Sequence, residues 1–163
     1  MRYSIRAMVA SDWEKVAKIF RQGMDTDLAR FEHVLPTYEE FKQSHLQNMQ
    51  FVCLEKEAVV GWATLSATST RAVYSGVTEL SIYVENAWKS QGVGSALLQY
   101  ISQKAEENGI WCIQSCIMRN NATSIAFHEK HGFRMIGYRE KVAKDRYGVW
   151  RDTVLMEKRN AIR

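Results

Sequence analysis

Apolar residues recur at two different spacings in the first third of the chain, and each spacing predicts a different element. Weak alternation over residues 3–8 predicts a strand. Helical spacing then predicts a helix to about residue 24 and is carried by Trp13, Val16, Ala17 and Phe20. Ser11 with Glu14, and Thr37 with Glu40, have the spacing of capping boxes. We therefore expect one helix to begin after Ser11 and a second to run from Thr37 toward residue 48.

Three strands are predicted next, followed by a helix. Residues 50–55 and 59–67 favour two strands joined by a turn near Lys56 and Glu57. Residues 77–84 favour a third strand, because alternation places Leu80, Ile82 and Val84 on one face and Glu79, Ser81 and Tyr83 on the other. A helix over 94–107 is predicted by its apolar stripe, which consists of Leu97, Leu98, Ile101 and Ala105. Asn108 and Gly109 end it.

The last third of the chain continues the mixture of strands and helices. We expect a strand over 111–117, a short helix over 121–131 closed by Gly132, and strands over 133–142 and 153–158. Helices placed among strands in this order indicate an α/β or α+β sheet with helices on its faces. The length of 163 residues fits a single domain over 1–163.

The composition limits the cellular compartment and the kinds of partner that we expect for this domain. No apolar run approaches the roughly 20 residues that span a membrane, and no apolar h-region follows residues 1–6, so we expect neither membrane association nor a signal peptide. Three cysteines, Cys53, Cys112 and Cys116, fit neither a metal site nor a disulfide framework, so a reducing cytoplasm suits them best. The net charge of +4 serves solubility or helps to hold a polyanion. Basic residues form no long run, and we expect no nucleic-acid partner.

A glycine-rich turn separates the strand over 77–84 from the following helix. It consists of Trp88, Lys89, Ser90, Gln91, Gly92, Val93, Gly94 and Ser95. Two glycines allow close approach of a ligand to the backbone, and the helix offers free N–H groups, so the turn suits a pyrophosphate or is merely a tight connection. A dinucleotide fingerprint needs glycine where Leu97 stands. A P-loop needs Gly-Lys-Ser/Thr where Gly94 is followed by Ser95 and Ala96, so both of these motifs are excluded.

The same turn resembles the acetyl-coenzyme A signature of the GNAT acetyltransferase superfamily, Arg/Gln-x-x-Gly-x-Gly/Ala after a strand, with Lys89 departing at the first position. A second block, from Asn121 to Phe133, is similar to the C-terminal half of that fold. Closer similarity is to the phosphinothricin (methionine sulfoximine) N-acetyltransferase branch. It is carried by Phe31-Glu32, Pro36 to Glu40, Arg71 to Tyr74, His128-Glu129-Lys130 and Tyr147 to Asp152. Ala72 replaces a proline of that branch, and Arg30 replaces a small Ser or Thr.

This resemblance implies a GNAT fold: a mixed, mostly antiparallel, twisted sheet of about six to seven strands flanked by about four helices. It also implies acetyl-CoA as co-substrate, with no metal, and direct transfer of the acetyl group to an amine in a ternary complex. Coenzyme contacts are implied for Ile82, Tyr83, Val84, Lys89, Gln91, Gly92, Val93, Gly94, Ser95, Asn121 and Ser124. Asn121 is equally a helix N-cap. Cys112 and Cys116 share one strand face, and we interpret them as core residues rather than nucleophiles.

Glu79 is the candidate base that deprotonates the amine, and the alternative is an ordinary ion-paired strand residue. His128 stands where many relatives have a tyrosine that protonates the leaving thiolate, and it equally fits a packing histidine. Acceptor contacts are implied for Phe31, Arg71, Tyr74, Glu79 and Trp150, with Arg71 holding a carboxylate. The branch implies a homodimer. A peptide or protein N-terminal acetyltransferase and a non-catalytic acetyl-CoA sensor remain as alternative functions.

Overall fold

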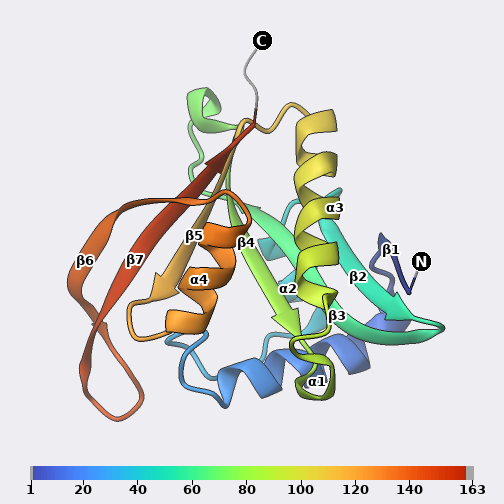
Figure 1. Cartoon of the computed structure of the whole chain (residues 1–163), viewed down its shortest axis with the longest axis horizontal. Coiled ribbons are helices and arrows are strands. Elements are labelled where there is room, and N and C mark those ends of the chain that lie inside the picture. The colour runs from blue at the N-terminus through green and yellow to red at the C-terminus, as the bar shows by residue number, and fades with distance from the viewer. Residues whose placement is uncertain (1, 161–163) are drawn as a thin grey trace.

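A computed structural model of the chain describes residues 2–160 (Figure 1). Its elements follow the predicted order of one strand, two helices, three strands, a helix, a strand, a helix and two strands. Their bounds are β1 (Tyr3–Ala7), α1 (Trp13–Met24), α2 (Tyr38–Ser44), β2 (Gln50–Glu55), β3 (Ala58–Ala67), β4 (Val77–Val84), α3 (Val93–Glu107), β5 (Cys112–Met118), α4 (Ala122–Lys130), β6 (Arg134–Lys144) and β7 (Trp150–Arg159). Three 3-10 turns, η1 (Ala10–Asp12), η2 (Ala72–Tyr74) and η3 (Asn86–Trp88), connect them.

All seven strands form one sheet in the order β1-β2-β3-β4-β5-β7-β6. Every neighbouring pair is antiparallel except β4 and β5, which run parallel because α3 connects them across one face. The prediction of a mixed, mostly antiparallel sheet of six to seven strands with four helices is confirmed.

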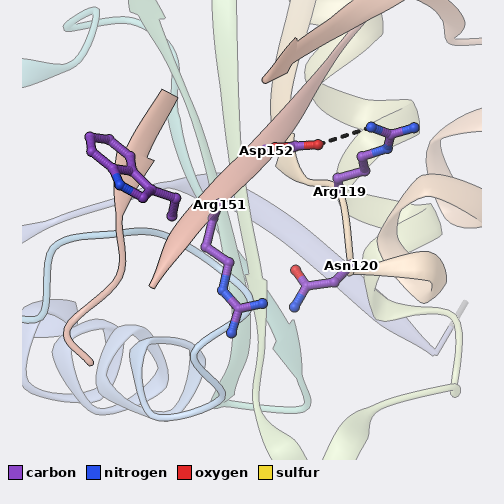
Figure 2. A pocket seen from close by; sticks show the side chains of 5 residues that line it. Arg119, Asn120, Arg151 and Asp152 are labelled. Atoms are coloured by element: carbon purple, nitrogen blue, oxygen red, sulfur yellow. Dashed lines mark hydrogen bonds and ion pairs between the residues drawn. The ribbon is translucent and has the colours of Figure 1, made fainter. Parts of the chain in front are cut away.

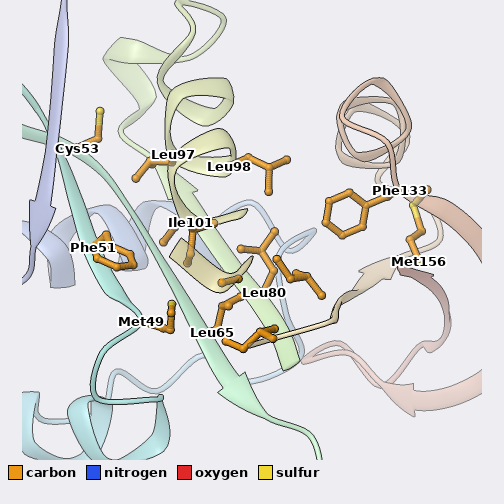
Figure 3. Close-up of a cluster of buried hydrophobic side chains, with 14 of the residues drawn as sticks. Met49, Phe51, Cys53, Leu65, Leu80, Leu97, Leu98, Ile101, Phe133 and Met156 are labelled. Atoms are coloured by element: carbon orange, nitrogen blue, oxygen red, sulfur yellow. The ribbon is translucent and has the colours of Figure 1, made fainter. Parts of the chain in front are cut away.

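Each face of the sheet carries its own apolar core. On one face α3 packs through Leu97, Leu98 and Ile101 against β2, β3, β4 and β5 (Figure 3). On the other face α1 and α2 surround the fully buried Trp62 of β3. We call the first the α3 face and the second the α1 face. Side chains on β4 therefore alternate between two packed environments rather than between core and solvent.

The predicted capping box at Ser11 and Glu14 is wrong. The chain forms η1 before α1, and Asp12, the N-cap residue of α1, makes no side-chain hydrogen bond to that helix: its carboxylate accepts instead from the Val9 N–H at 2.9 Å, at the start of η1, and from Arg6. The second capping box is confirmed, since the Thr37 hydroxyl and the Glu40 carboxylate each accept the other's backbone N–H.

The second helix is shorter than predicted, ending at Ser44 instead of continuing toward residue 48. His45 is already extended, with φ −122° and ψ 160°. The Ser44 hydroxyl and His45 Nδ1 both donate to the carbonyl of Phe41, at 2.9 and 2.6 Å. These two side chains satisfy a carbonyl group of the last helical turn, so the helix can end here and the chain continues toward β2.

The hairpin of β6 and β7 is longer than the sequence predicts. Its turn is held by Asp145, whose carboxylate accepts the N–H groups of Tyr147 and Val149. Residues 138–141 of β6 are exposed on both faces, so alternation is weak there and the pattern ends too early. Six exposed apolar side chains lie on this arm: Met135, Ile136, Tyr138, Tyr147, Val149 and Trp150. In the described part of the chain, no helix has the length and apolar character to cross a membrane.

Candidate functional site

The parallel strands β4 and β5 separate partway along their length. They pair at Val77–Cys112, Thr78–Ile113 and Glu79–Gln114, and their pairing ends there. β4 continues to Val84 against β3, while β5 continues to Met118 against β7. The sheet therefore opens into a fork with Glu79 at its apex. The fork depends on how β4 pairs with β5, and α3 separates these two strands in the sequence. The residue pattern within either strand alone therefore does not predict it.

The backbone of β4 offers free hydrogen-bonding groups to the fork. Glu85 N–H donates to the Val60 carbonyl at 2.9 Å, which fixes the alternation along the regular β3–β4 register. Odd-numbered residues of β4 accordingly bond to β3, and Ile82 and Val84 turn their N–H and C=O groups toward β5. Beyond the fork apex no described residue pairs with them. Tyr83 bonds through its backbone to β3, so it can contribute to the fork only with its side chain.

The glycine turn lies where β4 leads into α3. Gly92 is the N-cap of α3 and has φ +87°, a conformation that favours glycine. A Cβ on Gly94 would lie 3.2 Å from Phe127 Cζ, so glycine lets α4 approach the helix mouth. The first helical bond is Ala96 N–H to Gly92 O, which leaves the preceding N–H groups of α3 free for an anion.

Two polar side chains of the turn behave differently. Gln91 is held in place, since its carbonyl accepts from the Tyr3 hydroxyl at 2.7 Å and its side chain bonds to Arg2 and Ala87 O. Lys89, which replaces the usual Arg or Gln, is exposed. The backbone of the turn is therefore preorganised, while the ammonium group of Lys89 is free to move.

Glu79 points to the α1 face together with Ser81 and Tyr83, as the alternation predicts. Cys116, two residues beyond Gln114 on β5, shares that face and is close enough to Glu79 to respond to its charge. Although part of Cys116 reaches the surface, desolvation by the surrounding chain, followed by the Glu79 carboxylate, raises the pKa of its thiol to about 11. The thiol remains protonated near neutral pH.

The assignment of both cysteines of β5 to the core is correct for Cys112 and wrong for Cys116. Cys112 is buried, whereas Cys116 is exposed. The reason is the fork: beyond Gln114 the β4 edge of β5 is unpaired, so no side chain of β4 flanks Cys116 on this face.

Helix α4 brings Asn121, Ser124 and His128 to the α3 face. Asn121 is the N-cap, its Oδ1 accepting the Ser124 N–H at 3.2 Å. His128 is 2% exposed, and its Nδ1 donates to the Ser124 carbonyl at 2.7 Å. Its Nε2 is buried and has no partner in the described chain. Burial lowers the pKa of His128 below its usual value, so the neutral ring presents an unprotonated Nε2.

The segment between α1 and α2, residues 25–37, crosses the open end of the fork. Just before it, Gly23 of α1 packs against the ring of Tyr83, and near its start the Asn121 side-chain amide donates to the Leu28 carbonyl at 3.2 Å. Phe31 lies on this segment. So does Arg30, which sits 5.1 Å from the Phe20 ring centroid and forms an ion pair with Glu32. Burial raises the pKa of Tyr83 to about 12.

The residues predicted to bind the acceptor substrate do not all lie close to one another within a single chain. Arg71 and Tyr74 are exposed and stack on each other at 5.3 Å, in and beside η2 at the start of β4, where β4 and β5 still pair. Trp150 lies at the other end of the fold, at the beginning of β7, and is also exposed. Figure 1 shows η2 and the tip of the β6–β7 hairpin at opposite ends of the molecule.

An open hollow of about 310 Å³ lies beside Trp150 and is lined also by Arg119, Asn120, Arg151 and Asp152. Asn120 and Arg151 point toward the same space, and an Arg119–Asp152 ion pair of 2.9 Å lies beside it (Figure 2). Arg151 donates through Nε to Asp145 at 2.9 Å. Sequence reasoning missed Arg151, although its alternation with Thr153 and Leu155 places it on the Glu79 face.

Coenzyme A fits the chemistry of these groups. The helix mouth with Gly92 and Gly94 suits a pyrophosphate, and the edge of β4 at Ile82 and Val84 suits an amide-bearing arm that pairs as an extra strand. The fork gives such an arm a route between the two faces of the sheet, ending near Glu79. Among residues 2–160, no three His, Cys, Asp or Glu side chains gather as metal ligands.

Fold and site together fit the class of acyltransferases that use coenzyme A. Residues 5–155 match the family model described as the acetyltransferase (GNAT) domain. The chain belongs to the GNAT acetyltransferase family and is an acetyl-CoA-dependent N-acetyltransferase, which confirms the resemblance, the enzyme class and the coenzyme expected from the sequence.

Similar proteins include a Bacillus subtilis protein provisionally named phosphinothricin acetyltransferase YwnH. It is 30% identical over 135 residues, 80% of this chain and 83% of that protein. The L-methionine sulfoximine/L-methionine sulfone acetyltransferase of Pseudomonas aeruginosa is 29% identical over 61% of this chain and 57% of that protein. Among solved structures, a Sinorhizobium meliloti phosphinothricin acetyltransferase in complex with acetyl-CoA superposes with a TM-score of 0.87. It is 28% identical, over 98% of this chain and 89% of that chain.

Proposed function

We propose that this enzyme acetylates the α-amino group of a small amino-acid-like acceptor, such as phosphinothricin or methionine sulfoximine, by direct transfer in a ternary complex. The observation that carries the proposal is Glu79 at the apex of the fork, on the face opposite the glycine turn. The named activities of the similar proteins support this acceptor class.

The proposed coenzyme contacts divide into three groups. Gly92, Val93, Gly94 and Ser95 would hold the pyrophosphate with backbone N–H groups, with Gln91 fixing the turn and Lys89 adding charge. Ile82 and Val84 would pair with the pantetheine arm through their backbone, and Tyr83 would contribute its side chain. Asn121 and Ser124 would line the other side of the fork. Acetyl-CoA supplies an acetyl group activated as a thioester.

Glu79 is proposed as the base that takes a proton from the acceptor amine, directly or through a water, since only the neutral amine attacks the thioester. His128 is proposed as the acid for the departing thiolate. The lowered pKa leaves the unpartnered Nε2 unprotonated in the resting ring, so in this role Nε2 first takes up a proton and then passes it to the thiolate. Holding both substrates in line lowers the barrier by removing orientational freedom.

The proposed acceptor pocket lies on the α1 face, beneath the segment that carries Phe31. Trp150 would border it near the β6–β7 hairpin, and the exposed Arg71–Tyr74 pair would bind an acceptor carboxylate. Because Arg71 lies away from the open end of the fork, its contribution has to be measured separately from that of Glu79.

The test is thiol release from acetyl-CoA in the presence of phosphinothricin, methionine sulfoximine, a panel of other amino acids and amines, and Ala- or Ser-led peptides. Glu79→Gln should abolish most turnover while leaving coenzyme A affinity unchanged. Glu57→Gln, an exposed acid in the β2–β3 turn, serves as the matched control and should turn over normally. Arg71→Ala should impair only acceptors that carry a carboxylate.

Three outcomes would contradict the proposal. Turnover of peptides but not of free amino acids would select an N-terminal acetyltransferase. Coenzyme binding without any turnover would select a sensor. Normal turnover by Glu79→Gln would remove the proposed base.

We further propose one domain over 1–163 that forms a homodimer in the cytoplasm. The six exposed apolar side chains of the β6–β7 arm support a partner surface. The free thiols of Cys53, Cys112 and Cys116 support a reducing compartment. Residues 1 and 161–163 lie outside the described residues. Sedimentation equilibrium of the purified chain distinguishes a dimer from a monomer of 18.8 kDa.

A further inference from the structure

Helix α4 packs directly against the first turn of α3. Phe127 fills the space left by the missing side chain of Gly94, and one helical turn later His131 reaches Ser95, with His131 Nε2 2.9 Å from Ser95 Oγ. The two rings on α4 stand 4.7 Å apart. Helix α4 therefore positions the first turn of α3, and Ser95 in that turn has His131 as its hydrogen-bond partner.

The direction of the Ser95–His131 hydrogen bond decides what the hydroxyl can offer to an anion. If Nε2 accepts, the hydroxyl proton is directed at the imidazole. If Nε2 carries a proton and donates to Oγ, the hydroxyl proton is free to point at a ligand. An anion at the helix mouth stabilises the second arrangement, because it accepts that proton in a charge-assisted hydrogen bond.

We propose that His131 is a positioning residue for the coenzyme: its Nε2–H holds the Ser95 oxygen and turns the Ser95 hydroxyl proton toward the pyrophosphate. This role rests on the coenzyme contacts proposed above for the glycine turn. It differs from the role of His128, because His131 acts through Ser95 and does not touch the reacting atoms.

The charged groups around His131 make the protonation state of its ring depend on whether the coenzyme is bound. Burial, followed by the positive charges of Lys130 on α4 and Lys158 on β7, lowers the pKa of His131. His128 is the other titratable group close enough to sense its charge. A bound pyrophosphate opposes the two lysines and favours the protonated ring. Coenzyme binding should therefore take up a fraction of a proton at a pH where the His131 ring titrates.

The test is calorimetric titration of the whole enzyme with coenzyme A, dephospho-coenzyme A and pantetheine, which lacks the pyrophosphate. His131→Leu should weaken both coenzymes about tenfold, the effect of one charge-assisted hydrogen bond, and leave pantetheine unchanged. His131→Gln, which keeps an amide N–H donor, should recover part of the affinity. Titration in two buffers of different ionisation enthalpy should show proton uptake in the parent enzyme and none in either variant.

Ser95→Ala provides the matched control. If His131 acts through Ser95, then His131→Leu costs nothing further on the Ser95→Ala background. Equal coenzyme affinity in His131→Leu and the parent enzyme would overturn the role, as would an equal loss for pantetheine, which also marks a folding defect. A parent enzyme that turns over acetyl-CoA with an unaffected His131→Leu refutes this inference alone. A parent enzyme that binds no coenzyme refutes the coenzyme contacts as well.

Discussion

Gly61 sets the distance between the sheet and the first turn of α3. It lies opposite Val84 in the β3–β4 register, on the α3 face. A Cβ there would meet Val93 Cγ1 at 2.8 Å, Leu97 Cδ1 at 3.1 Å and the Tyr83 carbonyl oxygen at 3.1 Å. The carbonyl is fixed by the sheet, so the buried side chains of Val93 and Leu97, and α3 with them, have to give way. Gly61→Ala should therefore displace the helix mouth that is proposed to hold the pyrophosphate.

The cost follows from two opposing effects. Overpacking a tight core site costs about 2 kcal/mol, and removing a glycine returns about 0.5 kcal/mol by restricting the unfolded chain. We expect a net loss of about 1.5 kcal/mol and a fall in Tm of about 4 °C, since 1 kcal/mol corresponds to about 2–4 °C at this chain length. Thermal and urea unfolding followed by tryptophan fluorescence measure the loss. Calorimetry should show weaker coenzyme A binding.

Relief of the clash provides the decisive comparison. Val93→Ala alone removes two methyl groups from a side chain that is 1% exposed and should cost about 2 kcal/mol. The double variant should cost about the same as Val93→Ala alone, because the new methyl group occupies the space that Cγ1 vacates. Gly137→Ala on β6, where a Cβ would meet nothing within 4 Å, is the matched control and should gain only the roughly 0.5 kcal/mol from the restricted unfolded chain. Additive losses in the double variant, or a Gly61→Ala protein as stable as Gly137→Ala, would refute the reasoning.

Three further predictions concern other parts of the fold. Ile101→Ala, at a fully buried position of α3, should lower the free energy of unfolding by about 3 kcal/mol in urea. Hydrogen bonds from Arg6 and the Val9 N–H lower the pKa of Asp12, so its contribution to stability is complete above the ordinary value of 3.8 and is lost as the pH falls through the lower folded pKa. Asp12→Asn should flatten the acid limb of the stability profile, and an unchanged limb would count against this pair. Arg146→Gln, which removes the ion pair to Asp27 at 2.8 Å, should speed amide exchange in residues 26–33, whereas Arg134→Gln at the other end of the hairpin should not.

The sequence predicts well those elements that are held in place by packing on the sheet, such as β4 and α3. The bounds of β4 and the stripe of α3 match the prediction because burial on two distinct sides imposes a strict period of alternation. Elements shaped by one side-chain contact were not predictable in this way. The entry into α1 is set by Asp12, whose carboxylate turns back to Arg6 of the preceding strand and to the Val9 N–H.

The candidate site shows the same division. The glycine turn and Asn121 are local features, so the sequence places them on helix starts, where the structure also has them. The fork is a property of two strands separated by α3, and it decides that Cys116 is exposed beside Glu79. The partnership of Ser95 and His131, 36 residues apart, likewise depends on how α4 docks.

The fork explains why one sheet can bring two separate substrates together. The proposed coenzyme contacts other than Tyr83 lie on the α3 face and along the free edge of β4, whereas Glu79 and the segment carrying Phe31 lie on the α1 face. A continuous sheet would keep these faces apart by its own thickness. Because β4 and β5 separate after Glu79, a thioester that enters from the α3 face can meet an amine on the α1 face without either substrate displacing the other. Variants on one face should therefore change the affinity for one substrate and leave the other unchanged, as direct transfer in a ternary complex requires.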